Sequence, residues 1–460
     1  MEEVEILDLN EDEKNEKDKK NNLNNKNKKK KKGKRKLSKK EKKFLLINII
    51  VILVIIVFYA YRFVHYYKLT HEVVENVTLK DKLTALNNLS YQNDGLHEKN
   101  GYFYYKGMDV DNYVYYSGKL FRIIDIDNGI RMIDDEALTN LVWGMSGKYN
   151  ESNIYTWLTD YLNSLKDYEV YLKENDWCNE SIDVENYQCN EKIKSYVGLI
   201  STSDYLQAGG KNSYLNSETY YWTINSDKDG KALYINNEGG INNLSSNEDN
   251  YFSYGIRPVI TLKEEISIVD GDGTKTNPYI IENLGKAMLR DNGVGSYVKY
   301  NNQDFRIMKT EDDGITLIYN GVIEVEKNYS DAIKYLNNDY LKDFNKEDLV
   351  KIEYSVSEYN YANKYDYKSS GSNNSNYVTM PKVGDMFINE YTGYWLNNIA
   401  DNKLGLYYTV DEHKMLFADL KGNKHNLRPV IKLNSEMVVV SGTGTSTDPL
   451  MVGDNDVKED

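Results

Sequence analysis

The chain is poor in the residues that most often carry metal or covalent chemistry. Its 460 residues include 2 cysteines, 5 histidines and 5 prolines. No two histidines stand at the spacing of zinc ligands on one helix face, and His71-Glu72 lacks the second histidine of a metalloprotease helix. Gly209-Gly210-Lys211 lacks the upstream glycine of a phosphate-binding loop, and no Gly-x-Ser-x-Gly elbow occurs. The sequence therefore predicts no catalytic residue, no metal site and no cofactor.

The chain contains one long apolar run, at residues 44–61. At 1.5 Å per residue this run would span roughly 27 Å, close to the hydrocarbon thickness of a bilayer. Lysines and arginines crowd residues 19–43, so the positive-inside rule puts the N-terminus in the cytoplasm. We expect a single-pass transmembrane helix at residues 44–63, with the following domains extracellular at the cell membrane. A cleaved signal peptide is the alternative, opposed by the long preceding segment and by the lack of small residues after the run.

The charge of the chain is unevenly distributed. The formal net charge is −14, and because the basic excess lies in residues 19–43, the remainder is more acidic still. A polybasic segment beside a membrane span is attracted to anionic lipid by about 1 kcal/mol per basic residue. An acidic remainder is a poor general binder of polyanions. We therefore expect a membrane partner and no nucleic acid, with residues 1–43 forming a disordered charged tail.

The two cysteines, Cys178 and Cys189, lie in a polar stretch of the part expected to be extracellular. In an oxidising compartment they are expected to form a disulfide that closes the loop 179–188. Restriction of the unfolded chain by such a loop stabilises a fold by about 2 to 3 kcal/mol. Two free thiols or a redox pair is the alternative.

Residues 99–283 and 284–452 carry the same landmarks in the same order, which indicates a tandem duplication. Tyr113 lies eight positions before a Phe-Arg-Ile sequence, and so does Tyr297. In each segment an Arg-Pro-Val-Ile sequence stands 14 positions before a Gly-x-Gly-Thr sequence. We call the two segments the first and second repeat. The predicted organisation is a charged tail at 1–43, a transmembrane helix at 44–63, a linker at 64–98, the repeats at 99–283 and 284–452, and an acidic tail at 453–460.

Each repeat opens with β-branched and aromatic runs separated by turn residues, a pattern that predicts a three-stranded antiparallel meander. The runs are 113–116, 121–126 and 130–133 in the first repeat, and 297–300, 305–308 and 315–319 in the second. A helix is expected next, capped by Ser152 in the first repeat and by Ser330 in the second. Its apolar residues recur at helical spacing, so one stripe should be buried.

Several residues that occur in both repeats have a structural and a functional interpretation. We expect a structural role for Arg257 and Arg428, because a guanidinium at the end of an apolar strand commonly binds carbonyl or carboxylate groups inside a domain. Trp222 and Trp395 are expected to be core residues, and stacking on a sugar is the alternative.

The Asp270–Gly273 sequence resembles the start of a calcium loop, in which alternating carboxylates bind a hard cation. Its counterpart, Ser441–Gly444, keeps the glycines and lacks the carboxylates. We therefore interpret both as structural turns in which glycine adopts backbone angles that other residues resist.

The first repeat resembles an uncharacterised domain family found in surface and secreted proteins of low-GC Gram-positive bacteria. The resemblance rests on Tyr196–Gly210 (YVGLISTSDYLQAGG), Tyr221–Thr223, Gly255–Ile260 and Gly271–Ile280, and the second repeat matches through Asn426–Leu433 and Gly442–Pro449. That family is distantly similar to the C-type-lectin-like fold, which includes formylglycine-generating enzymes. The resemblance implies an α+β fold with small antiparallel sheets, a helix and long loops. The Glu-Pro-Asn motif of the lectins and the late cysteine pair of the enzymes are absent, so it implies no activity.

The repeats differ most in four polar segments, and variable loops on a shared scaffold commonly carry binding residues. These segments are 170–192, 224–250, 346–376 and 397–404. The leading hypothesis is a membrane-anchored bacterial surface protein whose two lectin-like domains bind a glycan, a cell-wall polymer or a surface protein. The alternatives are a non-catalytic envelope spacer or assembly protein, and an extracellular enzyme with convergent loop carboxylates.

Overall fold

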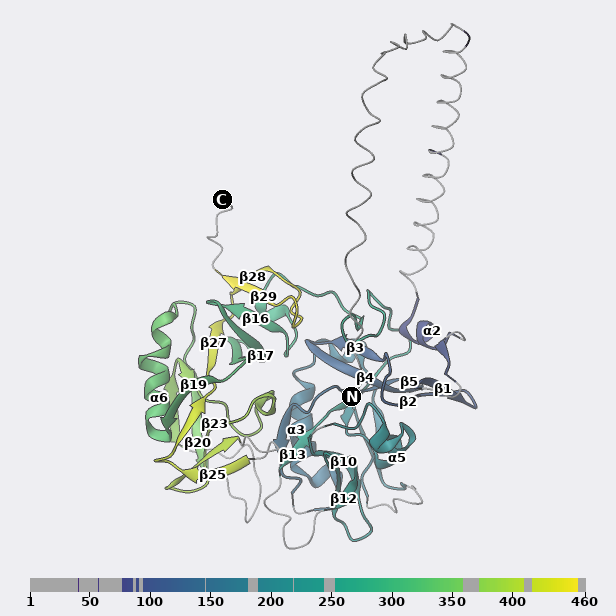
Figure 1. The fold of residues 1–460 in the computed structure, drawn as a ribbon, viewed down its shortest axis with the longest axis horizontal. Coiled ribbons are helices and arrows are strands. Elements are labelled where there is room, and N and C mark those ends of the chain that lie inside the picture. Colours follow the sequence, from purple (N-terminus) through teal and green to yellow (C-terminus); the bar gives the residue numbers. More distant parts are fainter. Residues whose placement is uncertain are drawn as a thin grey trace, which may run out of the picture. The chain divides into compact units, whose positions relative to one another are not determined.

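The structure is a computed structural model (Figure 1). It describes residues 40, 57, 77–85, 88–90, 94–144, 146–180, 189–217, 219–243, 253–358, 372–408 and 416–453. The chain divides into two compact units, Met1–His71 and Glu72–Asp460, and both repeats belong to the second unit. The boundaries predicted between tail, linker and repeats stay predictions.

The predicted single-pass membrane anchor is not supported. No helix in the described ranges is long and apolar enough to cross a membrane. The longest described helices have 10 residues, which gives roughly 15 Å, about half of a bilayer core. Of the predicted span 44–63 only Val57 is described, and the rest lies outside the described residues, as does all of the tail 1–43 except Lys40. The expected cell-membrane localisation and extracellular placement are therefore not supported either.

The predicted α+β fold with small sheets is wrong, because the protein is mostly sheet. Strands make up 41% and helices 16% of the structure. The sheets are also larger than expected, with eight, seven, seven, five and two strands. They grow because strands from distant parts of the chain extend each predicted meander, and some of these strands pair in parallel. Such long-range pairing leaves no local sequence signal.

The larger sheet of the first repeat is built on the predicted meander. Its strands are β1 (Gly95–Lys99), β2 (Tyr102–Lys106), β3 (Tyr113–Tyr116), β4 (Lys119–Asp127), β5 (Gly129–Asp134), β9 (Val197–Gly198), β14 (Val259–Leu262) and β15 (Tyr279–Ile280). The sheet order is β1-β2-β4-β5-β14-β9, with β3 also beside β4 and β15 parallel to β3. β14 is buried along its length, as expected for a central strand covered on both faces.

The second repeat forms the same sheet from equivalent strands. They are β16 (Tyr297–Tyr300), β17 (Gln303–Glu311), β18 (Gly314–Tyr319), β22 (Val378–Thr379), β27 (Val430–Asn434), β28 (Val438–Ser441) and β29 (Leu450–Gly453). Their order is β22-β27-β18-β17-β16-β29-β28. The registers agree, since Tyr113 lies opposite Arg122 in the first repeat and Tyr297 lies opposite Arg306 in the second.

A smaller sheet follows in each repeat, again in equivalent order. In the first repeat it comprises β12 (Ile241–Asn243), β11 (Ala232–Ile235), β10 (Tyr221–Ser226), β13 (Tyr254–Ile256) and β6 (Thr139–Leu141). In the second it comprises β25 (Leu416–Leu420), β24 (Leu404–Tyr408), β23 (Tyr394–Ile399), β26 (Lys424–Leu427) and β19 (Ile323–Asn328), with β20 (Ile352–Glu358) and β21 (Ser372–Asn376) added beside β23. In both, the strand that begins with Tyr-Trp pairs in parallel with the strand before the Arg-Pro sequence.

The predicted helices are present, with one correction. The helices are α2 (Leu79–Leu83), α3 (Asn153–Leu162), α4 (Tyr168–Tyr171), α5 (Thr202–Gln207) and α6 (Tyr329–Asn338). Ser152 caps α3 by accepting a hydrogen bond from the Tyr155 amide, as predicted. The cap of α6 is Asn328 and not Ser330, because the Asn328 side chain reaches the Asp331 amide.

The repeated arginines and tryptophans are core residues. Trp222 and Trp395 are fully buried, and each indole donates to a backbone carbonyl, that of Leu141 and that of Lys327, both at 2.8 Å. Neither tryptophan can therefore stack on a sugar.

Arg257 and Arg428 are buried and bind backbone carbonyl groups at the ends of β5 and β18, in agreement with the predicted structural role. Arg257 donates from Nε to the carbonyl of Asp134 at 3.0 Å, and Arg428 donates from Nε to the carbonyl of Tyr319 at 2.9 Å. Arg428 also forms an ion pair with Glu390 at 3.3 Å.

The two Gly-x-Gly-Thr turns require glycine for steric reasons. Gly271 and Gly442 have φ of +99° and +92°, and a Cβ on either would lie 2.0 Å from the carbonyl oxygen of the following proline. Pro278 and Pro449 supply these oxygens. No group of three or more metal-ligating side chains occurs in the described part of the chain, the Asp270–Gly273 turn included.

We predict that Gly442→Ala lowers the free energy of unfolding by more than about 1 kcal/mol, because the new methyl group meets the carbonyl of Pro449. Gly422→Ala is the matched control, since a Cβ there meets nothing within 4 Å. The control should leave the free energy of unfolding unchanged or raise it by up to about 1 kcal/mol. Equal losses in the two variants, measured by chemical denaturation, would contradict the steric explanation.

Candidate functional site

The two repeats meet at a close backbone contact. The turn Ser117-Gly118 between β3 and β4 packs on the segment that precedes β16, and a Cβ on Gly118 would lie 2.5 Å from the Ser296 amide nitrogen. Lys119 is buried beside this turn and donates to the carbonyl of Val294 in the second repeat at 2.7 Å. Tyr115 donates from its hydroxyl to the carbonyl of Gly444 at 3.0 Å. We call this contact the junction.

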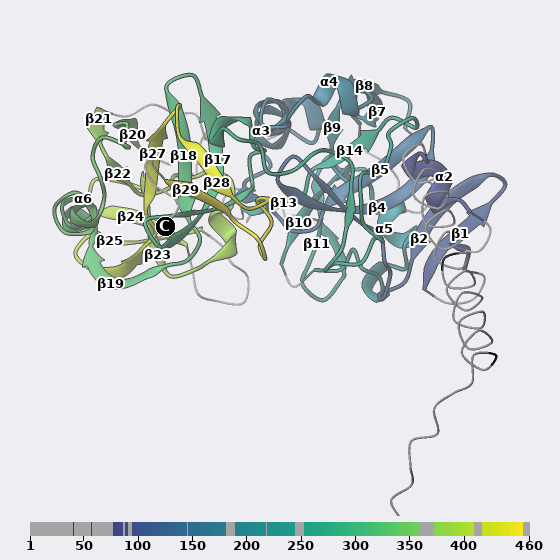
Figure 2. The ribbon, with the colours of Figure 1, turned by 90° about the horizontal axis from the view of Figure 1, so that it is seen from above.

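A second contact joins α3 of the first repeat to the turn 382–386 of the second. The indole of Trp157 donates to the carbonyl of Gly384 at 2.7 Å, and Trp157 also stacks on Tyr161, with the ring centres 5.5 Å apart. Figure 2 shows α3 on the side of the first repeat that faces β17 and β18. The two contacts hold the C-terminal end of α3 opposite the second half of β17.

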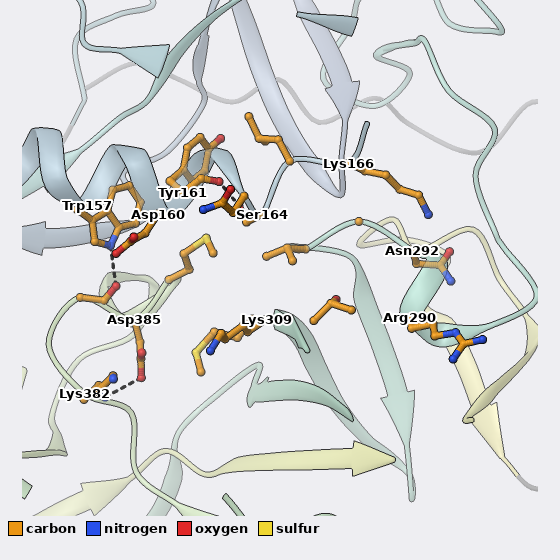
Figure 3. Close-up of a pocket in the computed structure, with 18 of the residues that line it drawn as sticks. Trp157, Asp160, Tyr161, Ser164, Lys166, Arg290, Asn292, Lys309, Lys382 and Asp385 are labelled. Carbon is orange, nitrogen blue, oxygen red and sulfur yellow. Dashed lines mark hydrogen bonds between the residues drawn. The ribbon is translucent and has the colours of Figure 1, made fainter. Parts of the chain in front are cut away.

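A pocket of about 510 Å³ lies between these two contacts (Figure 3). Four segments line it. The first repeat supplies the end of α3 with the residues that follow it, and the second repeat supplies the segment before β16, the second half of β17 and the turn after β22. The lining residues are Trp157, Asp160, Tyr161, Asn163–Lys166, Arg290, Asn292–Val294, Met308–Thr310 and Lys382–Met386. The pocket therefore depends on both repeats.

The lining combines a cationic rim with apolar side chains. Four of the lining side chains are cationic and two, Asp160 and Asp385, are acidic. Lys166, Arg290 and Lys382 have no acidic ion-pair partner among the described residues. Two methionines, two valines, a leucine and the indole of α3 supply the apolar surface. The chain has a net charge of −14, so this cationic rim is opposite in sign to the charge of the chain as a whole.

The equivalent position of the first repeat is closed by an ion-pair network of one buried and two half-buried side chains. Arg131 donates from Nε to Asp125 at 2.9 Å and from its Nη atoms to the two carboxylate oxygens of Asp204 at 3.0 and 2.7 Å. Burial acts to raise the pKa of Asp204, and the charge and hydrogen bonds of Arg131 hold this pKa below its ordinary value. Tyr102 of β2 lies beside this network, and burial together with the charge of Asp125 raises the pKa of its hydroxyl.

The second repeat has different residues at these positions. The matched registers of β4 and β17 place Lys309 where the first repeat has Asp125, and those of β5 and β18 place Thr316 where it has Arg131. The two strands even share an irregularity after the same residue, Ile123 in β4 and Ile307 in β17. Because Lys309 replaces the acid and Thr316 replaces the arginine, the second repeat cannot form the same ion-pair network at these positions.

Asp385 keeps the position of Asp204 without its arginine. Burial raises the pKa of Asp385, and the charge of Lys382 opposes that shift. The carboxylate accepts a hydrogen bond from the Lys382 amide at 2.8 Å (Figure 3). Asp385 is therefore a turn-capping acid at the pocket wall that is more easily protonated than an ordinary aspartate.

A second group of buried charges lies behind the pocket, at the junction. Burial lowers the pKa of Lys119 to about 7 and raises the pKa of Asp134 to about 8. One carboxylate oxygen of Asp134 and the hydroxyl of Tyr161 have no hydrogen-bond partner. Because all three side chains are buried and Lys119 binds Val294, we assign this group to holding the repeats together.

The cysteines predicted to pair are disulfide-bonded, with the Cα atoms 5.8 Å apart. Cys178 ends β7 (Asn175–Cys178), which pairs with β8 (Lys192–Ser195) in a separate hairpin. Neither cysteine lines the pocket. The bond therefore anchors one variable loop and has no contact with the candidate site.

The pocket does not lie where the sequence placed the binding residues. As far as the four variable segments are described, none of their residues lines it. Residues 181–188, 244–250 and 359–371 of those segments lie outside the described residues. A sequence signal for the pocket does exist: aligning the repeats strand by strand shows acid replaced by lysine at 309 and arginine replaced by threonine at 316.

Comparison of the chain with family models, with curated proteins and with solved structures finds no match. The resemblance to a bacterial surface-domain family therefore stays a prediction, and the function rests on the site itself.

We predict that Asp385→Asn stabilises the protein more as the pH rises. The folded-state pKa of Asp385 is raised, so the folded state binds this proton more tightly and loses stability as the pH rises through that pKa. Asparagine carries no charge, so its burial has no such pH-dependent cost, and its side-chain oxygen can still accept a hydrogen bond from the Lys382 amide. Unfolding measured between pH 3 and pH 8 should show little difference at the acidic end and a growing advantage of the variant above it. A difference that is constant or shrinks with pH would contradict the assignment.

Proposed function

We propose that the chain is a binding protein, with no catalytic role assigned to the pocket, and that it binds an anionic group of a larger ligand between its two repeats. The observation that carries this proposal is a set of three cations, Lys166, Arg290 and Lys382, around an apolar surface, with no ion-pair partner in the described part of the chain. Lys166 is half-buried and the other two are exposed. Cations gathered around one site attract carboxylate, phosphate or sulfate groups and can form charge-assisted hydrogen bonds with them.

The lining residues favour binding over reaction. They include no histidine and no cysteine, and the hydroxyl of Ser164 is bound to the carbonyl of Tyr161 at 2.6 Å. A nucleophile held by a neighbouring base is the usual sign of covalent catalysis, and this lining contains no such pair. Lysine and arginine side chains around apolar surface are instead typical of ligand recognition.

A second cavity, lined by residues of both repeats, has acidic side chains in its lining. Its volume is about 580 Å³, and its lining includes Asp135, Glu136 and Glu390 and no cationic residue. Two of these acids already have cationic partners, since Asp135 pairs with Arg122 and Lys275, and Glu390 pairs with Arg306 and Arg428. The pocket between α3 and β17 is favoured for an anion because three of its cations have no acidic ion-pair partner among the described residues.

We predict that the double variant Arg290→Ser/Lys382→Ser binds an acidic peptide at least about tenfold more weakly than the unmodified chain, a loss of about 1.4 kcal/mol. Lys192→Ser/Lys194→Ser is the matched control, because it removes the same charge from exposed positions of β8 that do not line the pocket. Fluorescence anisotropy with a labelled glutamate-rich peptide measures both, at two salt concentrations, since a charged contact weakens as salt rises.

Equal affinities of the two double variants would show that only the overall charge matters and would contradict a pocket-specific function. An oligogalacturonate and inorganic phosphate are tested in the same assay, so that an anionic glycan and a simple anion are compared with the peptide.

A further inference from the structure

The central strands of the two repeats differ along one edge. In the first repeat the same edge of β4 pairs with two strands: with β3 along Lys119–Arg122, and with β2 at Asp125 and Ile126. In the second repeat β16 pairs with β17 along Gln303–Arg306. No strand in the described ranges pairs with that edge of β17 further along, at the positions equivalent to Asp125 and Ile126. Those positions are Lys309 and Thr310.

The reason for this open edge is the different course of the preceding chain. By the register of the two repeats, the counterpart of β2 is the segment Lys286–Arg290. This segment runs toward β28 instead: the amide of Leu289 donates to the carbonyl of Met437 at 2.9 Å, and the amide of Val439 donates to the carbonyl of Ala287 at 2.8 Å. The hydrogen bonds that would have formed a strand beside β17 are therefore made elsewhere.

The open edge lies inside the pocket. Met308, Lys309 and Thr310 are lining residues, and the last two are exposed. A strand edge with free N–H and C=O groups is a template for another extended chain, and peptides commonly bind in this way. Because both central strands share the same irregularity, the backbone of β17 passes this place as β4 does. The first repeat thus shows, in the same molecule, what an added strand at this edge looks like.

We propose that the pocket binds an extended acidic peptide segment, which pairs antiparallel with β17 at Lys309 and Thr310 in the place that β2 occupies in the first repeat. This inference rests on the proposed function and specifies its ligand. Its acidic character follows from the cations Lys166, Arg290 and Lys382, which leave the site net positive. Alternate residues of a strand point to opposite faces, so acids at alternate positions can face the cations while apolar residues face the methionines.

The experiment uses the full chain and a labelled hexapeptide of alternating valine and glutamate, blocked at both ends. Two further peptides carry N-methyl groups at alternate residues, one in each register, so that one of them loses the N–H groups needed for pairing and keeps its charge. We expect the unmodified peptide to bind and one N-methylated peptide to bind at least tenfold more weakly. Hydrogen exchange of the amides in the 308–311 stretch should slow at least tenfold in the complex.

The outcomes separate this inference from the proposed function. If both N-methylated peptides bind as well as the unmodified one, or if exchange at 308–311 is unchanged, strand addition is wrong although the pocket binds anions. Tighter binding of an oligogalacturonate than of any peptide would also overturn it, because that glycan has no backbone amides to pair. If no anion binds in a manner that depends on Arg290 and Lys382, both the inference and the proposed function fail.

Discussion

The contact between the β3–β4 turn and the segment Gly293–Ser296 determines how the two repeats meet, and the pocket depends on it. Gly118 and Gly293 allow the two backbones to approach within a distance that a Cβ would prevent. Lys119 crosses the junction and donates to the carbonyl of Val294, and Asp134 lies near it in the same buried region. With the backbones fixed in this way, α3 comes to lie opposite the open half of β17, and the space between them becomes a pocket.

The duplication explains why such a pocket exists in one repeat and not in the other. Both repeats keep the strand order, the buried arginine and tryptophan, and the glycine turn, because each of these is needed to close the sheets. The edge of the central strand is different. The first repeat covers it with β2 and the Asp125-Arg131-Asp204 network, whereas in the second repeat the equivalent segment pairs with β28. Lys309 is therefore exposed, whereas Asp125 at the equivalent position of the first repeat is covered by β2.

Much of the local structure could be predicted from the sequence, because it depends on residues close together in the chain. The meanders, the α3 cap at Ser152 and the buried stripe of that helix follow from periodicity and turn residues. The roles of Arg257 and Trp222 followed from their recurrence in the second repeat. The cap at Asn328 was missed because Ser330, two residues later, is an equally good capping type.

The fold class and the candidate site could not be predicted in this way. The sheets grow by pairing strands from opposite ends of a repeat, as β15 does with β3, and no local pattern records such partners. The pocket brings together residues such as Trp157 and Gly384, which are far apart in sequence. The pocket does not lie in the described parts of the variable loops. The change of charge at equivalent strand positions therefore indicated its place better than the variability of the loops did.

The most direct test of this account is hydrogen exchange in the free protein, comparing Asp125–Asp127 of β4 with Lys309–Glu311 of β17. The account predicts that the amides of the first stretch, which β2 covers, exchange at least about tenfold more slowly than the most exposed amide of the second. Equal protection of the two stretches would mean that the edge of β17 is already covered, and would contradict the claim that the second repeat leaves it open for a ligand.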